Sequence, residues 1–152
     1  MKPAKVLIAA AMLASSVVLA HTDEYLDTLQ APHGGQLRMS GIYHFELVVA
    51  RDSKQPKENP VVVYVTDHAG TKVSTVGAGG TVTIIAGKRK TNARLVPDGD
   101  NRLTASAKYA SAQDMKVVVS VAMPGKVVLQ ARFTPLAPMA APAKNGHMDQ
   151  KH

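Results

Sequence analysis

The chain consists largely of short segments rich in valine, isoleucine, threonine and tyrosine, separated by clusters of glycine, proline, asparagine and aspartate. Such segments favour β-strands, and the clusters between them favour turns. In the segment 42–50, apolar residues at every second position would share one face, while His44, Glu46 and Val48 would share the other. No stretch has the period of a long helix. Strands are expected at 42–50, 60–66, 80–86, 91–96, 102–107, 115–123 and 127–133.

This roughly even spacing predicts an all-β chain, folded as a small antiparallel immunoglobulin-like sandwich of about seven strands. The dipeptide Pro124-Gly125 suits the centre of a tight turn between the last two strands. With 152 residues, the chain can form one core and is too short for two ordinary domains. After the last strand, the chain is rich in proline and alanine and then polar, which predicts a flexible tail with histidine and methionine over 135–152.

The N-terminus has the order of a secretory signal peptide. Lys2 and Lys5 precede an apolar run over 6–20, which ends in small residues suited to cleavage between Ala20 and His21. The run is shorter than the roughly 20 residues that a membrane-spanning helix needs, so no integral membrane segment is expected after cleavage. The expected organisation of this exported protein is a signal peptide at 1–20, a β-sandwich domain at 21–134 and the tail.

The excess of basic residues does not indicate nucleic-acid binding. The chain has 18 basic and 11 acidic residues, a formal charge of +7, and loss of Lys2 and Lys5 with the signal peptide lowers it to +5. The densest basic group, Lys88-Arg89-Lys90, has no aromatic residues between its members, whereas nucleic-acid stacking needs such rings. There is no Gly-x-Ser-x-Gly motif and no serine with histidine and aspartate in supporting order, so no enzymatic activity is expected.

The absence of cysteine excludes disulfides, thiolate zinc sites and type-1 copper centres. A transition-metal site would therefore depend on histidine, with methionine or carboxylates, and imidazole is the commonest protein ligand for such metals. Two histidines stand in short motifs, one in Pro-His-Gly-Gly and one in Tyr-His-Phe-Glu. All six histidines follow the expected cleavage site, and they are His21, His33, His44, His68, His147 and His152.

The two motifs predict that His33 and Glu46 pair. A hairpin turn at Ser40-Gly41 would place His33 diagonal to Glu46 on the same sheet face as His44, with room left by the absent side chain of Gly35. His44 would lie several positions farther along at about 3.3 Å each, so a metal site that uses both histidines requires the glycine segment to fold back. Alternatively, His44 is a half-exposed strand residue and the glycines only form a turn.

Cleavage after Ala20 would make His21 a ligand, because its free α-amine and its imidazole can chelate one copper ion. A third ligand would come from His33, His44, Asp23 or Glu24. Equally, an exported protein can begin with histidine for no chemical reason. His68 is expected to be a solvated turn residue. The histidines and methionines of the tail are either loose copper ligands or part of an ordinary polar terminus.

Two segments, Ala31-Pro-His-Gly-Gly-Gln36 and Gly41-Ile-Tyr-His-Phe-Glu-Leu-Val48, resemble a β-domain of heavy-metal efflux systems in Gram-negative bacteria. That domain occurs in periplasmic adaptor (membrane-fusion) subunits and in small secreted relatives. Val63 to Gly70 and Asp98 to Leu103 are similar in kind, so the resemblance covers roughly 31–133. The chain lacks the long coiled-coil hairpin of the adaptors, so only metal handling is carried over. The resemblance implies a periplasmic metal-handling domain with metal positions at His33, His44 and Glu46.

The sequence thus predicts a periplasmic protein that binds a transition metal ion (Cu, Ni, Zn or Co) and buffers or delivers it in heavy-metal resistance or efflux, with an efflux-system component as its partner. The expected metal-ligating residues are His33, His44, Glu46 and His21. The alternative is a metal-free periplasmic module that recognises a protein partner through sheet edges or through the basic segment 88–90. A third hypothesis, a copper oxidase, rests on an N-terminal His21 alone.

Overall fold

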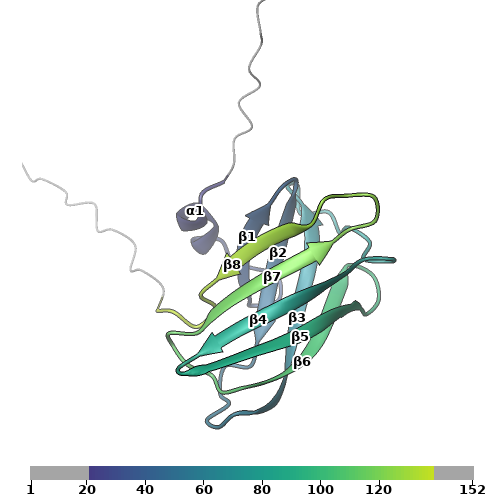
Figure 1. The fold of residues 1–152 in the computed structure, drawn as a ribbon. Helices are drawn as coiled ribbons and strands as arrows, with labels where there is room; N and C mark the ends of the chain where they lie inside the picture. Colours follow the sequence, from purple (N-terminus) through teal and green to yellow (C-terminus); the bar gives the residue numbers. More distant parts are fainter. Residues whose placement is uncertain (1–20, 139–152) are drawn as a thin grey trace, which may run out of the picture.

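The computed structural model describes residues 21–138, so the signal peptide expected at 1–20 and the tail residues 139–152 lie outside the described residues. Eight strands and one short helix make up this part of the chain (Figure 1). They are α1 (Asp23–Asp27), β1 (Gln36–Ser40), β2 (Tyr43–Val49), β3 (Lys57–Asp67), β4 (Gly79–Ala86), β5 (Arg89–Pro97), β6 (Arg102–Tyr109), β7 (Lys116–Ala122) and β8 (Leu129–Phe133). Within 21–138, no helix has the length and apolar character needed to cross a membrane.

The strands form one nearly closed, barrel-like sheet in the order β1-β2-β3-β6-β5-β4-β7-β8, with every neighbouring pair antiparallel. In Figure 1, β4, β7 and β8 lie across β1, β2 and β3. Strand β5 joins β1, β2, β3 and β6 on one side to β4, β7 and β8 on the other. It pairs with β4 along most of its length but with β6 only at Val96 and Pro97. The first and last strands meet where Ser40 Oγ in β1 donates a hydrogen bond to the carbonyl of Gln130 in β8 at 2.9 Å.

The prediction of an all-β antiparallel fold is confirmed, and residues 21–138 contain eight strands where about seven were expected. The seven expected segments correspond to β2 through β8, and β1 is additional. Its apolar residues, Leu37 and Met39, alternate as in a strand but are only partly buried, whereas its buried side chains, Arg38 and Ser40, are polar. The nearly closed sheet also lacks a clear division into the two sheets of an immunoglobulin-like sandwich.

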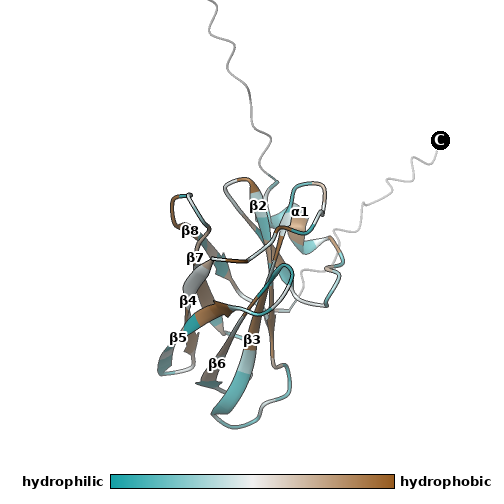
Figure 2. Ribbon diagram, turned by 90° about the vertical axis from the view of Figure 1, so that its right-hand side faces the viewer, coloured by the Kyte–Doolittle hydropathy of each residue, from teal (hydrophilic) through white to brown (hydrophobic). Residues whose placement is uncertain are grey.

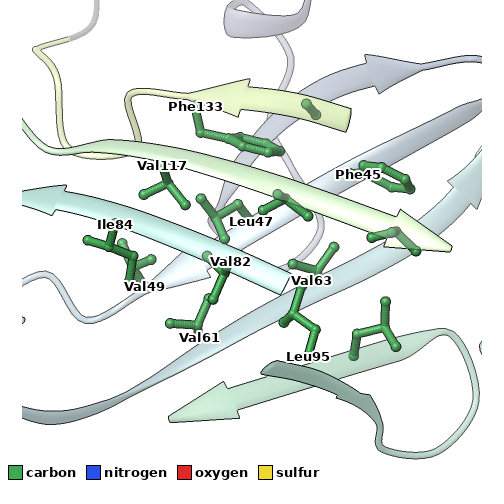
Figure 3. Close-up of a cluster of buried hydrophobic side chains, with 14 of the residues drawn as sticks. Phe45, Leu47, Val49, Val61, Val63, Val82, Ile84, Leu95, Val117 and Phe133 are labelled. Carbon is green, nitrogen blue, oxygen red and sulfur yellow. The ribbon is translucent and has the colours of Figure 1, made fainter. Parts of the chain in front are cut away.

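The core is formed by the apolar faces of the strands (Figure 3). The expected alternation in β2 is confirmed, since Phe45 and Leu47 are fully buried among valines of β3, β4 and β7 and beside Phe133 of β8. Burial of each such side chain favours the folded state by about 1.5–3 kcal/mol. The opposite face of β2 carries His44 and Glu46, which are buried but lie outside the apolar core. That face holds the candidate site.

The hairpin of β1 and β2 differs from the expected register by two residues. Ser40 pairs with Tyr43, so the loop consists of Gly41 and Ile42 rather than of Ser40 and Gly41. Gly41 has a φ of 60°, which glycine adopts without the steric penalty of a side chain. Because strand side chains alternate with a period of two, the two-residue shift leaves every side chain on its expected face. The tight turn expected at Pro124-Gly125 is present, closed by a hydrogen bond from Lys126 N to Met123 O at 3.1 Å.

Candidate metal centre

A cleft of about 370 Å³ lies over the outer faces of β2 and β3, where the segment before β1 passes across them. In Figure 1 and Figure 2, α1 lies beside the hairpin of β1 and β2 at this end of the sheet, and it contacts β1. The cleft contains a buried carboxylate, two tyrosines and four of the six histidines of the chain. The charged and aromatic residues that line it are His21, Tyr25, His33, His44, Glu46, Tyr64 and His68.

His44 and His68 come together because β2 and β3 are paired. His44 lies opposite Thr66 in the ladder, and His68 follows the end of β3 by one residue. The turn that holds His68 is fixed by Asp67, whose Oδ1 accepts hydrogen bonds from the backbone nitrogens of Ala69 at 2.9 Å and Thr71 at 2.8 Å. The two imidazole rings are stacked, with centroids 4.9 Å apart and an interplanar angle of 16°.

His21 reaches the same place from the N-terminal segment. Its ring centroid lies 5.7 Å from that of His44 and 5.9 Å from that of His68. Each of the three imidazoles offers one nitrogen within 4.8 Å of the other two. We call His21, His44 and His68 the three-histidine cluster. Three neutral imidazoles at this spacing are a typical donor set for Zn, Cu, Ni or Co.

The helix α1 holds His21 in position, since it starts two residues later. Thr22 is its N-cap, with Oγ1 accepting a hydrogen bond from Tyr25 N at 3.3 Å. Leu26 is buried, and Asp27 forms an ion pair of 2.7 Å with the nearly buried guanidinium of Arg38 in β1. These contacts attach α1 to the sheet, and His21 with it.

His44 has the most restricted environment of the cluster. It is 8% exposed, and its buried Nε2 has no hydrogen-bond partner among the described residues. Burial lowers the pKa of His44, and the neighbouring His68 and His21 lower it further, while Asp67 acts in the opposite direction. His44 is therefore held in the neutral form that binds metals. A buried nitrogen without a partner costs about 1–3 kcal/mol, and an ion bound to Nε2 would remove that cost.

A second polar arrangement in the cleft joins His33 to Glu46. The Oε2 atom of Glu46 lies 2.8 Å from His33 Nδ1, and Oε1 accepts hydrogen bonds from the backbone nitrogens of His33 at 2.8 Å and Gly35 at 3.0 Å. The His33 ring stacks on Tyr64, with centroids 3.6 Å apart and an interplanar angle of 2°. The Pro-His-Gly-Gly segment therefore wraps around one buried carboxylate, and the expected His33–Glu46 pair is confirmed.

The four expected metal residues thus fall into two groups. His44 lies with His21, and His33 lies with Glu46, so the structure does not bring all four around one point. His68 was not among the expected metal ligands. It is the exposed turn residue that was expected, and its ring also stacks on His44. The motif Asp-His-Ala-Gly directly after an expected strand was the available signal, and its use required the β2–β3 register.

The contacts of Glu46 indicate the role of its group. Glu46 has 4% of its side chain exposed and already accepts from backbone donors, whereas 40% of the His33 side chain is exposed. A carboxylate that contacts one ring nitrogen of a histidine fixes the orientation of the ring. Glu46 is therefore placed to orient His33, and the three-histidine cluster is the group that can surround one ion.

Comparisons of the chain with protein families, with curated proteins and with solved structures find no match.

Proposed function

We propose that this protein binds one transition metal ion through the imidazoles of His21, His44 and His68, and that it buffers or delivers the ion in the periplasm. The observation that carries the proposal is the mutual distance of at most 4.8 Å between one ring nitrogen of each histidine. Nitrogens bound to one ion at about 2.0–2.1 Å lie roughly 3–4 Å apart. Small side-chain rotations are enough to close the difference.

The protonation of the cluster supports the same function. Because the pKa of His44 is lowered, the central imidazole of the cluster is neutral near pH 7 and needs no proton release before it binds a metal. The chain contains no cysteine, so the donor set is nitrogen-based and suits Cu, Ni, Zn or Co. Export by the signal peptide and a role in heavy-metal resistance or efflux, with an efflux-system component as partner, belong to the proposal and rest on the sequence.

Calorimetric titration of the mature chain with Cu(II), Ni(II), Zn(II) and Co(II) tests the proposal. We expect one ion per chain, and we expect His44→Ala and His68→Ala each to weaken binding by about tenfold or more. The matched control is His33→Ala, which removes an imidazole from the same cleft outside the cluster. A double variant, His147→Ala with His152→Ala, controls for the histidines of the tail. Binding that survives loss of His44 and His68, or that depends on His33 instead, would overturn the proposal.

A metal-free interaction module remains the second candidate function, favoured by the basic hairpin tip between β4 and β5. Ala86 pairs with Arg89 across a two-residue loop, and Lys88, Arg89 and Lys90 are exposed. Such a tip can contact an acidic partner. Under this function, charge reversal at Lys88 and Arg89 would abolish the function of the protein in cells while His44→Ala would leave it intact, and the metal-binding proposal requires the reverse.

A further inference from the structure

The first residue after the expected cleavage site is itself a member of the three-histidine cluster. Residues 1–20 predict a signal peptide that is cut between Ala20 and His21. The imidazole of His21 lies within reach of His44 and His68, as the ring distances above show. The cut would therefore free an α-amine on a residue whose side chain is already at the candidate metal centre.

We propose that removal of residues 1–20 completes this centre by adding the α-amine of His21 as a fourth nitrogen ligand, and that the completed centre is specific for Cu(II). The inference rests on the proposed function, because it concerns the same cluster. It adds two elements to that function, namely the metal and the processing step on which tight binding depends.

The ligand chemistry explains why the cut matters. In the uncleaved chain, the nitrogen of His21 is an amide, which keeps its proton near neutral pH and does not bind metals. As a free amine it has a pKa of about 8, so it loses a proton readily when a metal ion takes the lone pair. The amine and the imidazole Nδ1 of one N-terminal histidine can hold the same ion as a chelate.

The number of nitrogens decides the metal. The chelate of His21 together with His44 and His68 provides four nitrogen ligands, and tetragonal nitrogen coordination is the arrangement that Cu(II) prefers. Three imidazoles alone suit tetrahedral ions such as Zn(II) equally well. Cleavage is therefore expected to raise the affinity for Cu(II) much more than the affinity for Zn(II).

The fold supports a fixed place for the new N-terminus. His21 directly precedes the N-cap Thr22, and α1 is attached to β1 by the ion pair of Asp27 and Arg38. His21 also lies against Tyr25, with ring centroids 5.0 Å apart. Because only one residue separates His21 from an attached helix, the α-amine stays near the cleft and little ordering entropy opposes its binding.

Two forms of the mature protein test the inference. Both begin at His21, one with a free α-amine and the other with that amine acetylated, which converts it to an amide, adds no new amine and leaves all three imidazoles unchanged. We expect the form with the free amine to bind Cu(II) at least about tenfold more tightly, with electron paramagnetic resonance showing coupling to an additional nitrogen. Zn(II) affinity should change by less than about threefold. Equal Cu(II) affinity in the two forms would overturn the inference.

Further measurements separate this inference from the proposed function. N-terminal sequencing of the exported protein should give His21 first, and any other first residue would overturn the inference while leaving the three-histidine site intact. A form with His21→Ala at its N-terminus keeps the amine but loses the chelate, so it should bind Cu(II) no more tightly than the acetylated form. If neither form that begins at His21 binds any metal, the proposed function fails and the inference fails with it.

Discussion

The carboxylate of Glu46 holds His33 through two contacts, with its backbone nitrogen and its Nδ1, and it also accepts a hydrogen bond from the backbone nitrogen of Gly35. All three nitrogens lie within 3.0 Å of a carboxylate oxygen. The carboxylate is 4% exposed, so water does not replace these partners if they are lost. The loop between α1 and β1 is thus fixed to the outer face of β2 by one side chain. This contact gives the wall of the cleft its shape and predicts which substitutions should disturb it.

Substitution of Glu46 by glutamine should destabilise the protein. The neutral amide removes the charge that the two backbone donors face, and its nitrogen cannot accept from His33 Nδ1, so that contact requires the other tautomer of the imidazole; the expected cost is about 1–3 kcal/mol. Urea unfolding of Glu46→Gln measures the change. The control is Glu58→Gln, since Glu58 contacts only Ser106, at 2.9 Å on the exposed surface, and should change stability by less than about 0.5 kcal/mol. Equal effects of the two variants would contradict this role of Glu46.

Gly35→Ala should break the contact between the loop and Glu46. A Cβ at residue 35 would lie 2.9 Å from Glu46 Cγ and would overlap the carbonyl oxygen of Leu47, so the backbone must move away. We expect the free energy of unfolding to fall by about 1–3 kcal/mol. We also expect the His33 Nδ1 hydrogen bond to be lost, which nitrogen NMR of the imidazole would detect. Gly34→Ala is the control: its Cβ would meet nothing within 4 Å, so its φ of 71° costs stability while the hydrogen bond survives. A surviving bond in Gly35→Ala would refute the prediction.

Tyr109 should make the protein sensitive to alkaline pH. Its hydroxyl donates to Pro60 O at 2.6 Å and accepts from Ala50 N at 2.9 Å, and burial raises the pKa of the phenol above its ordinary value near 10. Above that pH the unfolded chain loses the proton first, so the free energy of unfolding falls as pH rises. Tyr109→Phe should cost about 1–3 kcal/mol at pH 7 and remove part of the alkaline slope. Tyr25→Phe, at an exposed position, should behave as wild type, and identical slopes would count against the prediction.

Local patterns in the sequence were sufficient for much of the fold. The two faces of β2 follow from alternation within one segment. The pair of His33 and Glu46 was expected on a strand ladder, but β1 begins at Gln36, and His33 reaches Glu46 because the loop before β1 wraps around the carboxylate. Strand β1 was expected only as the first arm of a hairpin with 42–48 and was not counted among the strands, because the residues that it turns to the core are polar. Its buried Arg38 is compensated by Asp27 of α1, a tertiary ion pair that no periodicity reports.

The three-histidine cluster could not be predicted from local sequence patterns. His44 and His68 are brought together by the register of β2 and β3, which a long connection rather than a tight turn joins, so the spacing in sequence does not fix it. His21 joins them only because α1 is attached to β1 through Arg38. Both contacts are long-range, whereas the motifs around His33 and His44 are local. This explains why the expected ligand set contained His33 and omitted His68.

The metal-free protein should lose stability in acid because of His44. Its pKa lies below the ordinary value of 6.5, first through burial and then through His68 and His21, so below pH 6.5 the unfolded chain takes up a proton more readily than the folded one. The free energy of unfolding should therefore fall as pH drops through this window, and His44→Gln should reduce the dependence. His68→Gln tests whether His68 lowers the pKa of His44. Loss of the neighbouring imidazole should raise that pKa, as measured by proton NMR titration, and should partly reduce the dependence of the free energy of unfolding on pH. An unchanged His44 titration in His68→Gln would show that the two rings do not interact as their 4.9 Å stacking implies.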